Sequence, residues 1–308
     1  MLHTILGAGG SVGNALAYEL INSQKKVRLV SRSNFTISGA ESYKADLTSY
    51  PEALASLKDT DFAFLCVGLP YDSKIWDKVW HIIMQNIIDA CKTTGTKLIF
   101  FDNVYMYGKV NGEMTEDTPY NPCSRKGEVR AKIALLLEEE IKKKNINAII
   151  ARSADLYGPY ITDRSVPYFL VIDKLLKNKK PQWIVDPDKK HTYSYTIDCA
   201  KGMNMLSEDD ACYNQVWHLP TCNSEINGRK FIEIASKELG VSPNFSILKK
   251  GLMKFAGLFN KRIYESIEML YQFQFDYLFD SSKFEKYFNY KPISYYNGIQ
   301  ETIEFFKY

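Results

Sequence analysis

Three glycines near the start of the chain have a spacing that is typical of phosphate-binding turns. The sequence Gly7-Ala8-Gly9-Gly10-Ser11-Val12-Gly13 follows a short apolar run and precedes a segment with apolar residues at helical spacing. It fits G-x-x-G-x-x-G, whereas G-x-G-x-x-G would need a glycine where Val12 stands. Glycine lets the backbone turn sharply and approach a pyrophosphate, and the amides at a helix start attract the anion. The turn predicts a dinucleotide site formed by Gly7, Gly10, Ser11, Val12 and Gly13; a glycine-rich turn that binds nothing is the alternative.

A cation follows the second apolar run, where NAD-binding folds commonly have a carboxylate. Val27–Val30 is followed by Ser31-Arg32-Ser33. A carboxylate there would accept hydrogen bonds from ribose hydroxyls, whereas a guanidinium can pair with a 2′-phosphate. Arg32 therefore predicts that NADP(H) is preferred and that NAD(H) is the second choice; a solvated surface arginine is the alternative. Asp46, further along, either accepts a hydrogen bond from the adenine amino group or caps the helix that follows.

Short apolar runs and amphipathic segments alternate through the first half of the chain and must position these residues. The runs predict strands at His3–Leu6, Val27–Val30, Phe62–Val67, Leu98–Phe101 and Ala148–Ala151. Apolar residues three and four apart predict helices at Val12–Ser23, Tyr50–Leu57, Lys74–Thr93 and Gly127–Lys144. Because parallel strands need crossover connections, the alternation predicts an α/β fold with a Rossmann-type, doubly wound parallel sheet.

The alternation breaks after about Tyr157, where a second lobe is expected to begin. Further elements are predicted at Tyr168–Leu176, Gln182–Val185, Val216–Leu219, Arg229–Leu239 and Ile299–Phe306. The aromatic tract Tyr264–Phe279 contains Glu, Gln and Asp, and it predicts core or pocket wall rather than a membrane-surface helix. We expect residues 1–157 to form the dinucleotide-binding domain, with residues 190–215 returning to it. Residues 158–308 are expected to form mainly a smaller C-terminal α/β lobe that binds the substrate.

Composition and charge narrow the classes of partner. The 308 residues carry a formal net charge of +3 with both signs interleaved, which argues against a nucleic-acid surface. The six cysteines include no C-x-x-C pair, so neither a zinc site nor a disulfide framework is expected, and the cytoplasm is the expected compartment. No stretch approaches the ~20 apolar residues that span a bilayer. The expected partner is a small molecule, without nucleic acid, metal or membrane.

Several phrases along the chain resemble, in their order, the extended short-chain dehydrogenase/reductases, also called the NAD-dependent epimerase/dehydratase family. They are Ala45-Asp46-Leu47, Gln85–Cys91, Val104–Gly108, Ala151–Pro159, Tyr193–Ala200 and Asp280–Lys283. The resemblance implies a family that mostly acts on nucleotide sugars and often forms homodimers through the helices at 74–93 and 127–144. The set of expected cofactor-binding residues is completed by Leu47, Val67, Gly68, Arg130 and Asp155.

The chain departs from this family at the positions that carry its chemistry. Asn103 stands where the family has a Ser or Thr hydroxyl, and by the register of the family's Y-x-x-x-K motif Lys126 replaces the tyrosine and Arg130 the lysine. Arg130 can still bind the nicotinamide ribose, but it does not exchange protons. Lys126 could transfer a proton if burial and Arg130 lowered its pKa by several units from ~10.4; a structural or phosphate-binding lysine is the alternative. Tyr105, near the end of the strand that normally faces the nicotinamide, is a second candidate proton donor.

Two functions are consistent with these residues. The first is an NAD(P)-dependent oxidoreductase or epimerase-like enzyme with an altered catalytic site, acting on a sugar nucleotide or another alcohol or carbonyl substrate. The second is a non-catalytic sensor or regulator that binds NADP(H). The substitutions at Asn103, Lys126 and Arg130 keep the second function open. His81 and His191 lack the partner spacing of a metal site or a catalytic triad and are expected to be structural.

Overall fold

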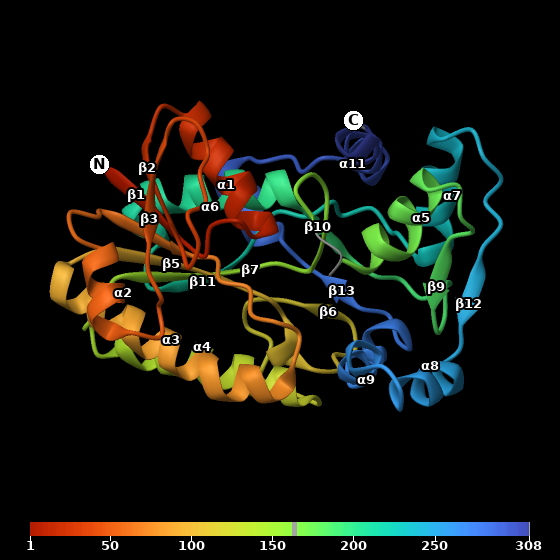
Figure 1. The fold of residues 1–308 in the computed structure, drawn as a ribbon, viewed down its shortest axis with the longest axis horizontal. Coiled ribbons are helices and arrows are strands. Elements are labelled where there is room, and N and C mark those ends of the chain that lie inside the picture. The colour runs from red at the N-terminus through yellow and green to blue at the C-terminus, as the bar shows by residue number, and fades with distance from the viewer. Residues whose placement is uncertain (162–164, 308) are drawn as a thin grey trace.

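A seven-stranded sheet, in which all neighbouring strands are parallel, forms the centre of the first half of the molecule (Figure 1). The computed structural model describes residues 1–161 and 165–307. In spatial order the strands are β11 (Gln215–His218), β7 (Ala148–Arg152), β5 (Lys97–Asp102), β4 (Phe62–Leu65), β1 (Leu2–Leu6), β2 (Lys26–Ser31) and β3 (Ala40–Lys44). The strand order reverses between β1 and β4, as in doubly wound sheets, so the predicted Rossmann-type fold is confirmed.

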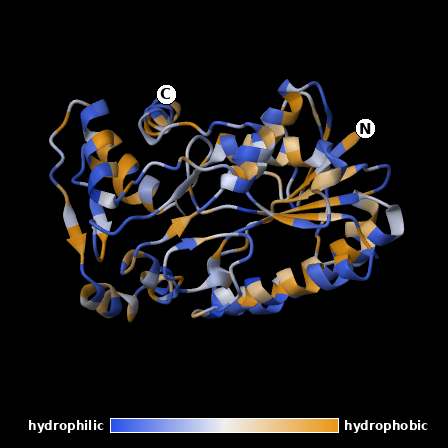
Figure 2. Ribbon diagram, turned by 180° about the vertical axis from the view of Figure 1, so that it is seen from behind, coloured by the Kyte–Doolittle hydropathy of each residue, from blue (hydrophilic) through white to orange (hydrophobic). Residues whose placement is uncertain are grey.

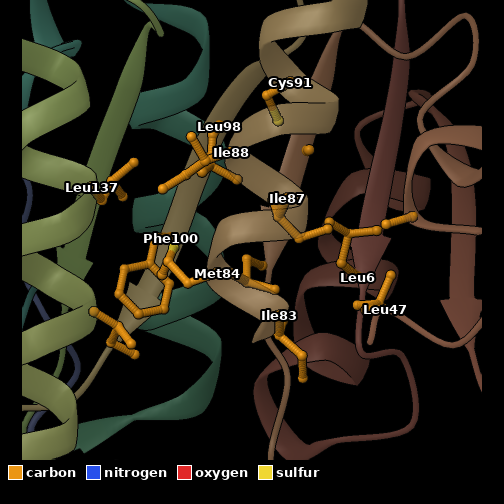
Figure 3. Close-up of a cluster of buried hydrophobic side chains, with 14 of the residues drawn as sticks. Leu6, Leu47, Ile83, Met84, Ile87, Ile88, Cys91, Leu98, Phe100 and Leu137 are labelled. Atoms are coloured by element: carbon orange, nitrogen blue, oxygen red, sulfur yellow. The ribbon is translucent and has the colours of Figure 1, made fainter. Parts of the chain in front are cut away.

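Helices cover both faces of this sheet, because its central strands are apolar on both sides. The helices are α1 (Ser11–Asn22) and α6 (Thr196–Glu208) on one face, and α2 (Tyr50–Ser56), α3 (Ser73–Thr94) and α4 (Arg125–Lys142) on the other. Ile5 and Ile99 pack under α1 and α6, while their neighbours Leu6 and Phe100 pack under α3 and α4, as the two-residue period of a strand requires. Figure 3 shows the cluster between the sheet and the helices α3 and α4, with side chains of α3 turned toward Leu6, Leu98 and Phe100.

The two helices that precede and follow β5 have clear start signals. The Asp72 side chain accepts hydrogen bonds from the backbone amides of Lys74 (2.9 Å) and Ile75 (3.3 Å), which caps α3. Ser124 accepts one from the amide of Gly127 (3.0 Å), which caps α4. These caps fix the helix ends that lie nearest the carboxyl edge of the sheet.

The second lobe contains short paired strands and small helices at the other end of the molecule (Figure 1). The strand pairs are β8 (Asp155–Tyr157) with β10 (Tyr193–Tyr195), β9 (Gln182–Ile184) with β12 (Ser246–Leu248), and β6 (Glu113–Met114) with β13 (Leu278–Phe279). The helices include α5 (Asp173–Leu176), α7 (Gly228–Glu238), α8 (Lys250–Gly257), α9 (Lys261–Ile267) and α11 (Tyr295–Lys307), whereas α10 (Ser282–Phe288) packs against β11 of the main sheet. Trp183, Phe231 and Ile299 belong to the buried core of this lobe.

The later part of the chain also completes the main sheet. β11, which begins at the last residue of the segment 190–215, pairs with β7, and α6, which lies within that segment, packs against α1. The aromatic tract at 264–279 is divided between the end of α9, the short helix η4 (Leu270–Phe273) and β13, and Leu270, Tyr271 and Phe273 are buried. No helix in residues 1–161 or 165–307 has the length and apolar composition needed to cross a membrane.

Candidate functional site

The glycine turn between β1 and α1 is closed by contacts that favour glycine. Gly7 has a φ of +96°, and a Cβ atom there would lie 2.6 Å from the Cα atom of Val67. A Cβ atom on Gly13 would lie 3.2 Å from the carbonyl oxygen of Gly7, so α1 packs tightly on the turn. Val67 is half-buried and Gly68 is exposed. The turn therefore brings the ends of β1 and β4 together at the edge of the sheet where doubly wound folds bind ligands.

Gly10 has no comparable role inside the chain. Its φ of −82° suits any residue, and a Cβ atom there would come no closer than 3.6 Å to the carbonyl oxygen of Gly7. Gly10 is the N-cap residue of α1, and within the described chain no side chain caps the amides of that first turn. The amides that follow, at Ser11, Val12 and Gly13, are therefore suited to an anion, and the missing Cβ leaves room above them. These residues fit the pyrophosphate of a dinucleotide.

Arg32 and Asp46 lie at neighbouring strand ends on the same edge of the sheet. Arg32 is exposed after β2. Hydrogen bonds from the backbone amide and hydroxyl of Thr48 (2.9 and 2.8 Å) lower the pKa of Asp46, and the charge of Arg32 adds a smaller effect. Ser49 is the N-cap residue of α2, so of the two predicted roles for Asp46 helix capping is not observed. Leu47 is buried, and its carbonyl accepts a hydrogen bond from the side chain of Asn86 (3.0 Å).

Lys126 is fully buried, and α9 and the residue after it hold its ammonium group. Nζ donates to Glu265 Oε2 (2.6 Å), to the carbonyl oxygen of Glu265 (2.9 Å) and to Glu268 Oε1 (2.8 Å). Burial alone would raise the pKa of Glu265. The hydrogen bond from Lys126 is among the contacts that outweigh burial, so the pKa of Glu265 is lowered. The ammonium also lies 4.4 Å from the centre of the Tyr71 ring. All three ammonium protons thus have acceptors, which suits an anchor between α4 and α9.

Arg130 is buried and forms an ion pair with the last residue of β5. Its Nε donates to Oδ1 of Asp102 (2.7 Å), and its guanidinium lies 4.6 Å from the Trp80 ring and 5.0 Å from the Phe100 ring. Asp102 is also 3.5 Å from Nε of Arg152, and all three charged side chains are buried. Arg130 therefore connects α4 to the end of β5 through an internal ion pair.

Asn103 and Tyr105 form the turn that follows β5. The side-chain oxygen of Asn103 accepts a hydrogen bond from the amide of Tyr105 (3.0 Å), at the start of the short helix η1 (Tyr105–Tyr107). The Tyr105 ring stacks on Trp76, with 6.4 Å between the ring centres. Burial and the charge of Asp155 raise the pKa of Tyr105 well above its ordinary value, although a hydrogen bond with Tyr71 opposes this. Tyr105 therefore keeps its proton at neutral pH.

Asp155 is bonded to a buried histidine that the sequence does not single out. Oδ2 of Asp155 lies 3.0 Å from Nε2 of His191, whose Nδ1 lies 3.2 Å from the carbonyl oxygen of Gln272. Both ring nitrogens of His191 thus have an oxygen within hydrogen-bonding distance. Burial is the main cause that raises the pKa of Tyr71, Tyr105 and Tyr277, and the charge of Asp155 is a smaller cause for all three. These phenols therefore lie near Asp155.

The sequence carries few signals for these additional residues. Glu265 and Glu268 are three residues apart, a spacing that places two side chains on one face of a helix. This spacing is the one local sign that they act together. His191 and Asp155 are brought together by the pairing of β8 with β10, which no local pattern near His191 indicates.

Comparison with known proteins agrees with this geometry. The model of the NAD dependent epimerase/dehydratase family matches residues 3–216. The chain belongs to this family. A search of curated protein sequences finds no match.

Solved structures with the same fold include three from bacteria. UDP-glucose 4-epimerase of Thermus thermophilus, in complex with NAD, has a TM-score of 0.81 and 15% identity, covering 99% of both chains. UDP-glucuronic acid 4-epimerase of Bacillus cereus, with NAD, has a TM-score of 0.82 and 19% identity, covering 100% of this chain and 99% of the other. dTDP-glucose 4,6-dehydratase of Bacillus anthracis, with NAD, has a TM-score of 0.82 and 16% identity, covering 99% and 96%. At these identities the likeness shows the fold.

In this chain, cations occupy the two positions that correspond to the Tyr and Lys of the Y-x-x-x-K motif, and both cations form internal ion pairs. Lys126 is bonded to Glu265 and Glu268, and Arg130 is bonded to Asp102. Tyr105 and Asp155 lie in the turn after β5 and in β8, and neither is part of those ion pairs. Both cations of this register therefore have internal partners in this chain.

Proposed function

We propose that the chain is an NAD(P)-dependent oxidoreductase or epimerase-like enzyme with an altered catalytic site. We propose NADP(H) as its preferred cofactor, NAD(H) as its second cofactor, and a sugar nucleotide or another alcohol or carbonyl compound as its substrate. Family membership supports this, as do the structural neighbours that hold NAD and are named for sugar nucleotides. The observation that carries the proposal is the position of the Tyr105 phenol, which follows the end of β5 and stacks on Trp76.

The glycine turn would hold the pyrophosphate of the cofactor. Gly7 and Gly13 shape the turn, Gly10 leaves space, and the amides of Ser11 and Val12 would donate to the phosphate oxygens. When bound, the nicotinamide supplies hydride transfer. Leu47, Val67 and Gly68 would complete the walls of this cradle.

Tyr105 would transfer the proton that accompanies reduction of a carbonyl group. The phenol of Tyr105 carries its proton at neutral pH, which is the form that a general acid requires. Because the side-chain oxygen of Asn103 accepts from the Tyr105 amide, its NH2 group is available to hold the substrate oxygen. Lys126 and Arg130 would position α4 and α9 around the site rather than touch the reacting atoms.

A test of this function is hydride exchange between deuterated NADPH and a panel of keto sugar nucleotides. We expect deuterium to appear in a product, and Tyr105→Phe to lower the rate by roughly 100-fold or more, because general acids contribute about 10²–10⁴-fold. Tyr18→Phe, on the exposed side of α1, is the matched control and should keep the wild-type rate. If Tyr105→Phe exchanged deuterium at the wild-type rate, Tyr105 would not be the proton donor.

Arg32 supports the preference for NADP(H), because its exposed guanidinium lies at the end of β2 without an adjoining carboxylate on that strand. We expect Arg32→Ala to lose roughly ten- to hundredfold in NADP(H) affinity and little in NAD(H) affinity, since a charge-assisted pair contributes about 1.5–3 kcal/mol. Calorimetric titration measures both affinities. Lys26→Ala, which removes a cation from the opposite end of β2, is the control. Equal wild-type affinities for the two cofactors would contradict the preference.

A second candidate function is a non-catalytic sensor or regulator that binds NADP(H). The observation that favours it is the engagement of both Lys126 and Arg130 in buried ion pairs. A sensor should bind the dinucleotide in calorimetry but show no deuterium exchange with any carbonyl compound. Exchange with one substrate decides for the enzyme.

A further inference from the structure

The hairpin formed by α8 and α9 exposes an unusual number of large apolar side chains. Leu252, Phe255, Leu258 and Phe259 are 58%, 63%, 73% and 80% exposed. They lie on successive turns of α8 and on the turn after it, and the rings of Phe255 and Phe259 are 5.5 Å apart. Scattered apolar residues on a surface need no explanation, but a contiguous group of this kind marks an interaction surface.

These exposed residues are not needed to hold the hairpin together. Its inner side is made by Met253 and Gly257, which are buried. A Cβ atom on Gly257 would lie 2.8 Å from Cδ1 of Ile267, so α8 and α9 approach each other closely at this glycine. The outward apolar group is therefore additional to the packing of the two helices.

Exposed cations surround the apolar group, and most of them have no acidic partner in the described chain. Residues 249–262 contain Lys249, Lys250, Lys254, Lys261 and Arg262 and no Asp or Glu, and all five cations are exposed. Lys261 pairs with Asp72, and Arg262 lies over the Phe169 ring. In the described chain the other three lysines form no ion pair, so their charge is directed to whatever covers this face.

We propose that the outer face of the α8–α9 hairpin docks on the surface of an anionic phospholipid bilayer. Phe and Leu side chains can enter the headgroup region while flanking lysines bind lipid phosphates, which is how amphipathic basic helices lie on membranes. From the sequence we expect no membrane partner, and the tract that we compare with a membrane-surface helix, residues 264–279, contains acidic residues. The basic segment just before it has the opposite character. Figure 1 places α8 and α9 together at the outer edge of the second lobe, and Figure 2 shows hydrophobic residues alternating with hydrophilic ones along this hairpin.

The inner face of the same hairpin reaches the candidate site. Glu265 on α9 binds Lys126 and the amide of Ser73 (2.8 Å). A docked hairpin would therefore hold the candidate site close to the lipid surface. The docking itself does not depend on the proposed enzyme activity, because it uses only the outward residues.

The test is co-sedimentation of the full chain with vesicles of phosphatidylcholine alone or mixed with phosphatidylglycerol. We expect binding to the mixed vesicles at least about tenfold stronger than to the neutral ones, and weaker in high salt. Phe255→Ser/Phe259→Ser and Lys250→Glu/Lys254→Glu should each lower it by about tenfold or more. The control is Lys74→Glu/Lys78→Glu, which reverses two exposed lysines at the same spacing on α3. Thermal melting checks that each variant is folded. The single variant Phe259→Ser changes only the most exposed of the four apolar residues, so it serves if the double variant does not fold.

Three results would overturn the proposal. One is equal binding to neutral and mixed vesicles, and another is unchanged binding by both double variants. The third is self-association in sedimentation that the Phe variants abolish while no vesicle binds, because the face would then join two copies of the chain. A Phe259→Trp variant gives an independent readout: its fluorescence should shift to shorter wavelength with mixed vesicles and stay unchanged with neutral ones.

Discussion

Gly7 and Gly10 belong to one turn, but the structure gives them different purposes. Gly7 has a left-handed backbone and lies against Val67, whereas Gly10 has an ordinary backbone, and a Cβ atom there would make only ordinary van der Waals contacts. A glycine that the fold does not require is best explained by a ligand that needs the space. The two positions can therefore separate folding from binding.

We expect Gly10→Val to fold with nearly wild-type stability but to lose dinucleotide affinity by roughly 100-fold or more, because the side chain would occupy the space above the helix start. Gly7→Ala is the contrasting variant and should lower the free energy of unfolding by about 1–3 kcal/mol, since its backbone is strained for any side chain. Calorimetric titration and urea denaturation measure the two effects. Wild-type affinity in a folded Gly10→Val variant would place the cofactor elsewhere.

His218 makes stability depend on pH. It is fully buried, its Nδ1 lies 2.7 Å from the carbonyl oxygen of Asp280, and its Nε2 lies 2.9 Å from the hydroxyl of Tyr107. Burial is the main cause that lowers the pKa of His218 to about 3. The unfolded chain, with a histidine pKa of about 6.5, binds this proton first as the pH falls. The stabilising effect of the neutral imidazole is thus complete above about pH 6.5 and is lost between about pH 6.5 and 3.

Between about pH 6.5 and 3, we expect protonation of His218 to lower the free energy of unfolding by up to about 1.4 kcal/mol for each unit by which the pH falls. His218→Gln keeps a donor and an acceptor but cannot titrate, so its stability should depend less steeply on pH. Urea denaturation at several pH values measures the slope. His81→Gln, on the exposed side of α3, is the control. An unchanged slope in His218→Gln would assign the acid sensitivity to other groups.

At the scale of elements, Lys126 fastens α4 to α9, and Arg130 fastens α4 to β5. We expect Lys126→Met to lower the free energy of unfolding by about 3–5 kcal/mol, because it leaves the buried carboxylate of Glu265 without its counter-ion. Adding Glu265→Gln should recover part of this loss. Urea denaturation of the two single variants and the double variant forms a double-mutant cycle. Strictly additive losses would show that the two residues do not stabilise each other.

Elements with strong periodicity could be predicted from the sequence, and elements at the surface could not. The helix predicted at Lys74–Thr93 is observed at Ser73–Thr94, because its buried stripe repeats over six turns. β3 (Ala40–Lys44) was not among the predicted strands, since it lies at the edge of the sheet, mostly exposed, and lacks a run of apolar residues. The aromatic tract 264–279 was expected as one segment, but its residues serve both a helix and a paired strand.

At the scale of the whole molecule, the two halves of the chain share one core. α6 and β11 come from beyond residue 190, yet they cover α1 and the edge strand β7. We expect the full chain to unfold in one transition and a chain ended after Tyr157 to stay loosely packed, because the apolar face under α6 would be exposed. Dye binding and near-ultraviolet circular dichroism report this packing. A sharp melt of the shortened chain, with a native dichroism spectrum, would show instead that residues 1–157 fold independently.

The candidate site combines parts that differ in how far apart they lie in the chain. The glycine turn could be predicted because its residues are contiguous and their spacing is set by local backbone geometry. The partners of Lys126 could not, since Glu265 lies 139 residues further along and is placed by the packing of the second lobe. The pairing of Asp155 with His191 has the same cause. Long-range packing thus determines which of the predicted polar groups remain available for chemistry.

The late position of β11 in the chain has a consequence for protein synthesis. Residues 153–214 separate β7 from β11, and at about 5–20 residues per second a ribosome needs roughly 3 to 12 seconds to add them. During this interval β5 can already pair with one edge of β7, while the other edge has no partner. An unpaired strand edge is a template for pairing with a different chain. The nascent polypeptide therefore passes through a stage in which one edge of β7 is open to pairing with another chain.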